Sequence, residues 1–332
     1  MCTHNSHVRK VGIFGTGSYV PDKILSNADL EKLVDTSDEW IQTRTGIKER
    51  RVKADGISTS DLALEAAKKA LAAANMAPEE IELIVVSTVT SDNYFPSTAC
   101  HVQRKLGAVN AAAFDVSAAC SGFIYGITVG WNMVSSGAFN NVLVIGAECL
   151  STLLDFTDRN SCILFGDGAG AVVLKETTGK HQILFSHLGA KGDVDVMIVP
   201  AGGSKLPTSH ATVDERLHYI KIRGREVFKF AVNKMTELIE DAANHLNIPV
   251  SEINIIIPHQ VNHRIIESAA EKLNYPMEKM FVNIHKYGNT SAASIPIALD
   301  EAHSSGRLKD GDVVVMAAFG AGLTWGSCAI RW

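Results

Sequence analysis

The sequence predicts an α/β protein made of two similar halves, because one order of helix, turn and strand occurs twice in it. Residues 61–90 read as a helix with one apolar face, a proline-containing turn and a buried strand, and residues 226–262 repeat that order. Further along, residues 114–148 and 282–320 share a strand, a turn, a helix ending at Ser-Ser-Gly and an apolar strand. Such a duplication predicts mixed sheets that are covered by helices on both sides.

The length agrees with two units that meet near residue 175. A chain of 332 residues corresponds to roughly two domains. We therefore expect an N-terminal half, residues 1–175, and a C-terminal half, residues 176–332. A glycine turn between strand-like runs closes each half, near residues 165–174 and 319–330.

Apolar residues at helical spacing mark the first helix of each repeat. In the N-terminal half the expected buried face holds Leu64, Ala67, Leu71 and Ala74. The equivalent face in the C-terminal half has six members, which are Phe228, Ala231, Val232, Met235, Ile239 and Ala242.

The alignment of the two halves pairs their loops. Ser87 ends a buried strand of the first repeat, and His259 directly follows the equivalent strand of the second. Cys120 and Asn289 occupy equivalent turns. If the halves pack about a pseudo-twofold axis, these loops converge at one place, where we expect a site.

Composition excludes several classes of protein. The chain is 46% hydrophobic and 20% charged, so it is too apolar to be disordered. Its 31 Lys and Arg against 36 Asp and Glu leave no cationic excess for nucleic acid. No apolar run reaches the length of about 18 residues that a membrane span needs. The six cysteines form no Cys-x-x-Cys pair, and residues 1–10 carry no export signal, so we expect reduced thiols and a cytoplasmic enzyme.

Cys120 is the candidate nucleophile. It follows a strand-like run and stands directly before the helical pattern that begins after Ser121 and Gly122. A helix N-terminus stabilises a thiolate, so this position predicts a lowered thiol pKa. The alternative is a buried cysteine that acts as a small hydrophobe, which is the interpretation we prefer for Cys149 and Cys162 inside apolar runs.

His259 and Asn289 are the candidate partners of Cys120. His259 is the first residue after a buried strand, where α/β folds place working groups, although a single histidine among 12 is more often structural. Asn289 lies in a Gly-Asn turn, and the alternative role is a helix cap or a turn residue.

The glycine-rich runs GTGSYV, GDGAGA and GAGLTWG do not fit phosphate-binding loops. Gly15 and Gly17 lack the third glycine of the dinucleotide fingerprint, and Gly166–Gly170 leads into a strand instead of a helix. We therefore expect tight turns and close approaches of the backbone at these glycines.

Several motifs together resemble the β-ketoacyl-acyl-carrier-protein synthase III family of bacterial fatty acid synthesis. They are DVSAACSGF, PHQVNHRII, KYGNTSAAS, TDRNSCILFGDGAGAVVL and FGAGLTWGS, with DTSDEWIQTRTGIKER near the start. The resemblance covers essentially the whole chain. It implies the thiolase fold, with duplicated α/β halves in a five-layered α-β-α-β-α arrangement, a homodimer, and no cofactor or metal.

The resemblance also implies a decarboxylating Claisen condensation. Cys120 takes an acyl group from an acyl-CoA, most simply acetyl-CoA, and malonyl-acyl carrier protein then enters. His259 and Asn289 stabilise the enolate that forms on decarboxylation. Backbone N–H groups of Cys120 and Ala321 hold the oxyanion. Ala321 replaces a glycine of some members and would be strained if its φ were positive.

Binding residues transfer by the same resemblance. It implies a CoA site formed by Trp40, Arg44, Arg159, Gly224, Phe228 and Asn262. A docking surface for the carrier protein is implied at Gln260, Val261, Asn262, His263, Arg264, Lys229 and Lys272. It places Phe95 and Leu150 at the acyl pocket, with Phe95 reaching across the dimer.

Other functions remain open at this point. A synthase of the same fold in a secondary-metabolite pathway, or an acyltransferase that does not condense, would carry the same triad. A thiolase would need a second cysteine near the end, and a hydroxymethylglutaryl-type synthase would need a general-base glutamate for which no motif matches. A silent subunit of this fold would lack Cys120.

Overall fold

The computed structural model describes residues 8–332, so Cys2 and the expectation that it is a free thiol lie outside the described residues. Within residues 8–332, nine strands form one continuous sheet, and this part of the chain also contains 11 α-helices. In sheet order the strands are β11 (Ile255–Pro258), β12 (Val313–Gly320), β13 (Gly322–Arg331), β8 (Gln182–Asp193), β1 (Val11–Tyr19), β7 (Asp167–Glu176), β6 (Asn141–Cys149), β4 (Leu83–Ser87) and β5 (Ala112–Val116).

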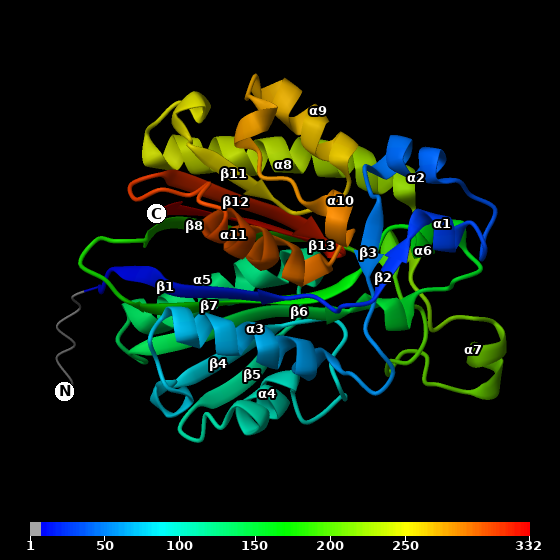
Figure 1. The fold of residues 1–332 in the computed structure, drawn as a ribbon, viewed down its shortest axis with the longest axis horizontal. Helices are drawn as coiled ribbons and strands as arrows, with labels where there is room; N and C mark the ends of the chain where they lie inside the picture. The colour runs from blue at the N-terminus through cyan, green and yellow to red at the C-terminus, as the bar shows by residue number, and fades with distance from the viewer. Residues whose placement is uncertain (1–7) are drawn as a thin grey trace.

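The helices lie in three layers that alternate with the two halves of the sheet (Figure 1). The outer layers are α3 (Thr59–Ala73) with α4 (Thr98–Leu106), and α8 (Gly224–Leu246) with α9 (His263–Leu273). Between the sheet halves lie α5 (Gly122–Ser135) and α11 (Ser294–Ser304), and each of them contacts strands of both halves. These are the five layers that the resemblance implies, so the predicted arrangement is confirmed.

The shorter elements lie mostly at one end of the molecule, which Figure 1 shows on the right. Two small ribbons pair β2 (Ile24–Ser26) with β3 (Glu49–Arg51) and β9 (Met197–Ile198) with β10 (Lys221–Ile222). The short helices are α1 (Asn27–Leu30), α2 (Asp38–Thr45), α6 (Arg159–Cys162), α7 (His210–Asp214) and α10 (Ile284–Tyr287).

The strand order repeats between the halves. In the N-terminal half it is β5-β4-β6-β7-β1, and in the C-terminal half β11, β12, β13 and β8 follow the same order. Met280 forms a parallel bridge beside Ile256 of β11, in the place that β5 takes beside β4. The pair Gly12 and Gln182 joins β1 to β8 and so makes the sheet continuous. The expected boundary between residues 175 and 176 falls at the end of β7 and stays a prediction.

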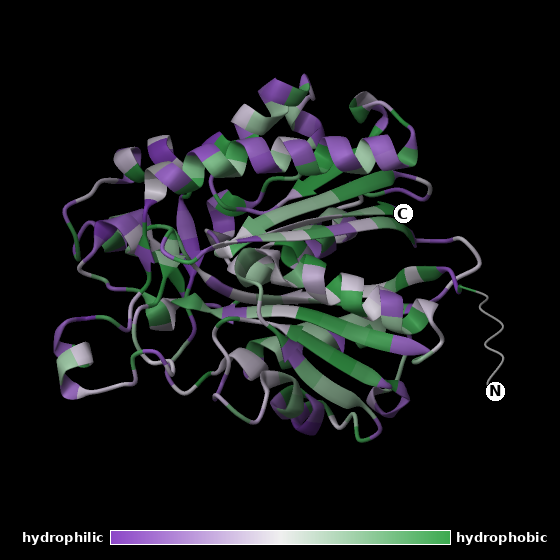
Figure 2. Ribbon diagram, turned by 180° about the vertical axis from the view of Figure 1, so that it is seen from behind, coloured by the Kyte–Doolittle hydropathy of each residue, from purple (hydrophilic) through white to green (hydrophobic). Residues whose placement is uncertain are grey.

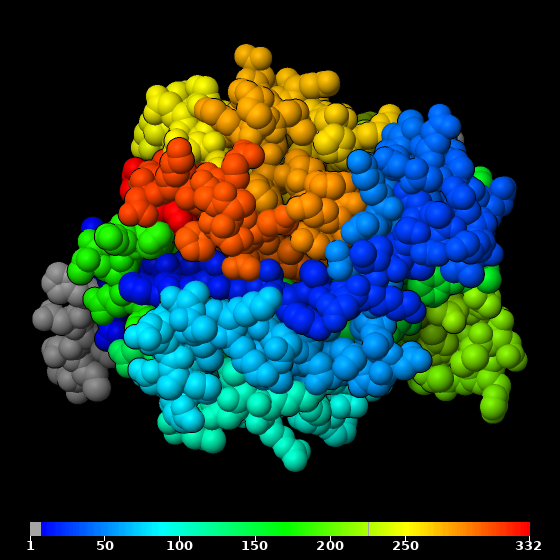
Figure 3. All heavy atoms as spheres, in the orientation of Figure 1, coloured from blue at the N-terminus to red at the C-terminus, as the bar shows by residue number. Residues whose placement is uncertain are grey.

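Apolar side chains fill the space between the layers. Figure 2 shows that they concentrate in the strands, while the outer helices carry apolar and polar residues on different faces. Figure 3 shows the seam between the halves, where the blue N-terminal segment that includes β1 crosses the surface between the cyan and the orange parts of the chain. None of the helices in residues 8–332 combines the length and the apolar character that crossing a membrane requires.

The predicted face of α3 is partly wrong. Ala67 and Leu71 are buried as expected, but Leu64 and Ala74 are only half-buried, and Leu62, Ala63, Ala66 and Ala70 are buried in their place. The reason is the close approach of α3 to β1, because a Cβ on Gly17 would collide with the backbone of Ala70. Only the alanine-rich face of the helix fits against this strand. The close approach predicted at the glycine-rich run is confirmed there.

Candidate active site

Cys120 lies in a short 3-10 turn, Ala119–Ser121, between the end of β5 and the first residue of α5. The turn is tight, since Ala119 adopts a φ of 45°. The end of β12 packs on it so closely that a Cβ on Gly320 would lie 2.6 Å from the Cys120 nitrogen. As a result Cys120 is only 6% exposed.

Burial dominates the acidity of this thiol. It raises the pKa of Cys120 to about 12, and the nearby Glu148 carboxyl acts in the same direction. The prediction of a lowered pKa is therefore wrong, because desolvation of the sulfur outweighs the field of the α5 N-terminus. Cys149 and Cys162 are buried as expected.

His259 follows β11 and is fully buried. Its Nδ1 lies 2.6 Å from the hydroxyl of Ser294, at the start of α11, and its Nε2 is buried without a partner among the described residues. Burial lowers the pKa of His259 to about 3, so the ring is neutral at physiological pH. If Ser294 donates to Nδ1, the ring proton lies on Nε2 and is free for a substrate oxygen.

Asn289 is held by both halves of the molecule. Its backbone N–H donates to the Leu164 carbonyl over 2.8 Å, and its carbonyl accepts from the Gly166 N–H over 3.0 Å. Its side-chain Oδ1 accepts a hydrogen bond of 2.8 Å from the backbone N–H of Ser291. The amide Nδ2 is therefore the end that remains available to donate.

One small cavity brings these three residues together. Cys120, His259 and Asn289 all line it, with Phe319 and Ala321 among its other walls. Ala321 is not among the positive-φ residues of the described chain, so the condition under which it would be strained is not met. The left-handed φ of 137° falls on the next residue, Gly322, which tolerates it.

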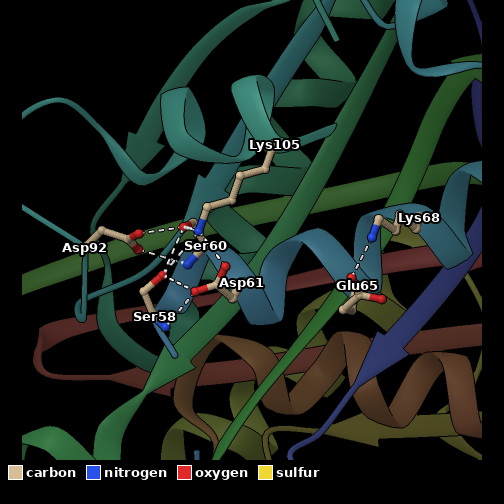
Figure 4. A network of polar contacts seen from close by, with 7 residues as sticks. All are labelled: Ser58, Ser60, Asp61, Glu65, Lys68, Asp92 and Lys105. Carbon is tan, nitrogen blue, oxygen red and sulfur yellow. Dashed lines mark hydrogen bonds and ion pairs between the residues drawn. The ribbon is translucent and has the colours of Figure 1, made fainter. Parts of the chain in front are cut away.

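A second cavity, apolar and about 260 Å³ in volume, opens from the other side of Cys120. Leu150 lines it, as the resemblance implies, but Phe95 does not. The Phe95 side chain is 85% exposed on a loop that Asp92 ties to the start of α3 by accepting hydrogen bonds from Ser60 (Figure 4). Its place at the pocket of a partner subunit stays a prediction.

Four of the six residues predicted to bind CoA, which are Trp40, Arg44, Arg159 and Asn262, lie on α2 or against it. The guanidinium carbons of Arg44 and Arg159 lie 4.8 Å and 5.1 Å from the centre of the Trp40 ring. Asn262 donates to the Arg44 carbonyl over 3.0 Å. Arg159 thus stacks on the Trp40 ring, which the resemblance predicts to stack on adenine.

Phe228 and Gly224 lie on the first turns of α8. Phe228 is half-buried, and the guanidinium of Arg264 lies 5.9 Å from its ring. Gly224 is exposed, with no atom near the place of a Cβ.

Of the seven residues predicted to dock a carrier protein, three are exposed, three are half-buried and Gln260 is buried. Arg264, Lys229 and Lys272 are exposed, although Lys272 also donates to Asn233 over 2.6 Å. Val261 lines the catalytic cavity, and His263 faces Glu267 at 3.1 Å.

Gln260 requires a correction. It is 1% exposed, and its side chain is fully engaged with the backbone of Pro258, Phe281, Asn283 and Ile284. It fixes the His259 loop from inside and cannot contact a carrier protein.

The sequence reasoning missed three residues around the site. They are Glu148, a fully buried carboxyl at the end of β6, and the hydroxyls of Ser291 and Ser294. Glu148 was detectable as an acidic residue that ends an apolar strand. The two serines lie in the same motif as Asn289.

Comparison with known proteins identifies the family. The sequence models described as 3-oxoacyl-[acyl-carrier-protein] synthase III and as the C-terminal part of that enzyme match residues 114–192 and 243–332. A β-ketoacyl-[acyl-carrier-protein] synthase III of Caldanaerobacter subterraneus is 55% identical over 97% of both chains. The chain belongs to the β-ketoacyl-[acyl-carrier-protein] synthase III family. One of the two matched segments contains Cys120, and the other contains His259 and Asn289.

Other family members agree over the same length. The synthase III of Clostridioides difficile is 52% identical over 97% of this chain and 98% of its own. The crystal structure of the 3-oxoacyl-[acyl-carrier-protein] synthase III of Aquifex aeolicus superposes with a TM-score of 0.90 at 49% identity, covering 97% of this chain and all of that one. The likeness to the family therefore extends over both halves.

Proposed function

We propose that the protein is a β-ketoacyl-[acyl-carrier-protein] synthase III that starts fatty acid synthesis. It joins an acyl-CoA primer, most simply acetyl-CoA, to malonyl-acyl carrier protein and releases CoA and CO2. One observation carries the proposal, which is the meeting of the Cys120 thiol, the unpartnered His259 Nε2 and the free Asn289 amide at one cavity.

In the first half-reaction Cys120 Sγ attacks the thioester carbon of the primer. The oxyanion that forms lies against the backbone N–H groups of Cys120 and Ala321. CoA leaves, and the acyl chain occupies the apolar cavity beside Leu150. Because the reaction passes through this acyl-enzyme, two easier steps take the place of one difficult condensation.

In the second half-reaction malonyl-acyl carrier protein loses CO2, and negative charge builds on its thioester oxygen. His259 Nε2 and Asn289 Nδ2 donate to that oxygen. Both groups are held in place through their other atoms, by Ser294 and Ser291, so little reorganisation is needed as the charge develops. The carbanion then attacks the acyl carbon and frees Cys120.

The binding partners follow from the clusters around the site. Trp40, Arg44 and Arg159 offer stacking and positive charge to the nucleotide end of CoA. The exposed cations Lys229, Arg264 and Lys272 offer a basic surface to an acidic carrier protein. The free thiols of the described residues fit the cytoplasm.

A homodimer is part of the proposal. The edge strand β5 pairs only with β4 in the sheet, and all five of its residues are at least partly exposed. Tyr94 and Phe95 are 84% and 85% exposed on a neighbouring loop. A second copy would cover both features, and light scattering on the purified protein measures the mass.

The acyl-enzyme is tested by mapping label from acetyl-CoA. We expect the label on the peptide that contains Cys120, and none on that peptide in Cys120→Ala. Cys149→Ser is the matched control, since it removes another buried thiol near the site and should leave labelling intact. An unlabelled Cys120 in the wild-type protein would refute the proposal.

A role in a secondary pathway is the second candidate. The priming β-ketosynthase of the R1128 polyketide pathway superposes with a TM-score of 0.88 at 32% identity, so the same architecture serves such a pathway. Competition among acyl-CoA primers of different length and branching separates the two. Preference for acetyl-CoA supports initiation of fatty acid synthesis, and preference for a long or branched primer supports the specialised role.

A further inference from the structure

Glu148 is a buried carboxyl group that the mechanism above leaves without a role. It is the next-to-last residue of β6, it is fully buried, and four groups donate hydrogen bonds to it. These are the hydroxyls of Thr88, Thr90 and Ser291, at 3.2, 2.7 and 3.1 Å, and the N–H of Val89 at 3.2 Å. Ionising a carboxyl group that is buried without a cation among its partners costs free energy, and the group avoids this cost when it takes up a proton.

Ser291 connects this carboxyl to the nucleophile. Its hydroxyl donates to Glu148 Oε1, and the turn that carries Ser291 packs against the turn that carries Cys120. Ser291 and Cys120 line the same cavity wall. A hydroxyl that already donates to a carboxylate keeps its lone pairs for an S–H donor, so the three groups form a continuous path for a proton.

Cys120 needs such a path because its thiol is protonated at neutral pH. The two nearby groups that could accept the proton are His259 and Glu148. Burial lowers the pKa of His259 to about 3, whereas it raises the pKa of Glu148 to about 7, so Glu148 is the much stronger base. The titratable side chains that face Glu148 are the thiols of Cys120 and Cys149.

We propose that Glu148 stores the proton of Cys120 during the acyl-enzyme stage and that the Ser291 hydroxyl transfers it. This rests on the proposed function. As Cys120 Sγ bonds to the thioester carbon, its proton passes to Ser291 Oγ, and the Ser291 proton passes to Glu148 Oε1. The C–S bond to CoA breaks, and the CoA thiolate takes a proton from solvent. When the carbanion attacks, the C–S bond to Cys120 breaks and the stored proton returns by the same path.

Glu148 acts here through Ser291 and is a positioning and proton-holding residue. The pathway predicts that acylation needs ionised Glu148, so the rate should rise as the pH rises through about 7. It also predicts that the loss of either member removes the path. The second loss should then add little to the first.

The test measures single-turnover release of CoA from acetyl-CoA as a function of pH. We expect Ser291→Ala and Glu148→Gln each to slow acylation about 100-fold, a typical contribution of general-base catalysis, and to abolish the dependence near pH 7. The double variant should be no slower than the slower single variant. Ser291→Ala keeps the backbone N–H that holds Asn289, so it tests the hydroxyl alone even if Glu148→Gln fails to fold.

Ser87→Ala is the matched control. The Ser87 hydroxyl is buried, as that of Ser291 is, and it donates to the Gly122 carbonyl at the start of α5, the helix that follows Cys120. It is not part of the proposed proton path. It should acylate at the wild-type rate with the same pH profile. Glu148→Asp, which keeps a carboxyl group, should keep a pH dependence that Glu148→Gln loses.

Three outcomes overturn the relay. These are wild-type acylation by Ser291→Ala, an unchanged pH profile in that variant, or losses that multiply in the double variant. Because wild-type protein is acylated in each of these cases, they leave the proposed function standing. Failure of the wild-type protein to release CoA and label Cys120 refutes the function instead.

Discussion

At the residue scale, each of the two candidate donors uses one end of its side chain for a hydrogen bond within the protein. Only the other end is available to donate to a substrate. Ser291 occupies Oδ1 of Asn289 and leaves Nδ2 to donate, and Ser294 occupies Nδ1 of His259 and leaves Nε2 in the cavity. Neither donor has to break a hydrogen bond to meet a substrate. A site arranged in this way suits stabilisation of an enolate.

Substitution of Asn289 should separate the two half-reactions. Removing one donor to a developing oxyanion costs about 100- to 1,000-fold in rate, so Asn289→Ala should lose decarboxylation of malonyl-acyl carrier protein by that order. Release of CoA from acetyl-CoA should continue, because Asn289 has no part in the attack by Cys120. The two steps are measured separately, as CO2 release and as labelling of Cys120.

Asn289→Asp is the informative companion. It keeps an oxygen to accept from the Ser291 N–H and, when ionised, offers no donor. It should therefore lose decarboxylation as Asn289→Ala does. Full activity in the aspartate variant would show that the amide N–H is not the working group.

The sequence was sufficient to predict that the three candidate residues meet at one place, but not what surrounds them. Repeats and strand ends pointed to Cys120, His259 and Asn289, because backbone topology follows from local patterns. The acidity of Cys120 and the inward direction of Gln260 could not be read, since both depend on which distant segments bury them. A polar run such as PHQVNHR looks the same whether its side chains face water or the backbone of another loop.

At the element scale, a buried arginine connects the segments that carry residues predicted to bind CoA. Arg50 of β3 is fully buried and donates to Asn27 Oδ1 at 2.9 Å, to the Leu25 carbonyl at 3.0 Å and to the Ile163 carbonyl at 2.9 Å. Asn27 begins α1, and Ile163 directly follows α6, the helix of Arg159. Arg50 therefore ties the β2–β3 ribbon and the start of α1 to the end of α6, and Asn27 in turn donates to Asp38 of α2, the helix of Trp40.

Replacing Arg50 should weaken both stability and CoA binding. Arg50→Met leaves buried carbonyl groups without donors, which we expect to cost about 3 kcal/mol or more. The KM for acyl-CoA should rise, because Trp40 and Arg159 lose their fixed spacing. Denaturant unfolding and initial rates measure the two effects.

Arg51 provides the control for Arg50. It is the next residue of β3, is partly exposed, and pairs with Glu49 at 3.5 Å. Arg51→Met should cost about 1 kcal/mol or less, as is usual for a solvated pair. Equal losses in the two variants would contradict the role assigned to Arg50.

At the scale of the whole molecule, the active site depends on contacts that cross the seam between the halves. Thr16 and Ser18 of β1 donate to Asp300 of α11 over 2.7 and 2.6 Å. The segment around Phe165 forms a parallel bridge with Asn289. The N-terminal half thus supplies the thiol and also fixes the loop on which the C-terminal half carries its amide.

Gly146 tests how closely this fit must be kept. It lies in the middle of β6, and a Cβ there would collide with the carbonyl of Ala292, the residue after Ser291. Gly146→Ala should force the Asn289 loop away from Cys120, cost about 1–3 kcal/mol of stability, and slow condensation. Gly192→Ala is the control, because no atom lies within 4 Å of the place of its Cβ, and it should leave both properties unchanged. If Gly146→Ala were as stable and active as the wild type, the loop could not be set by this contact, and its hydrogen bonds with Leu164 and Gly166 would have to hold it instead.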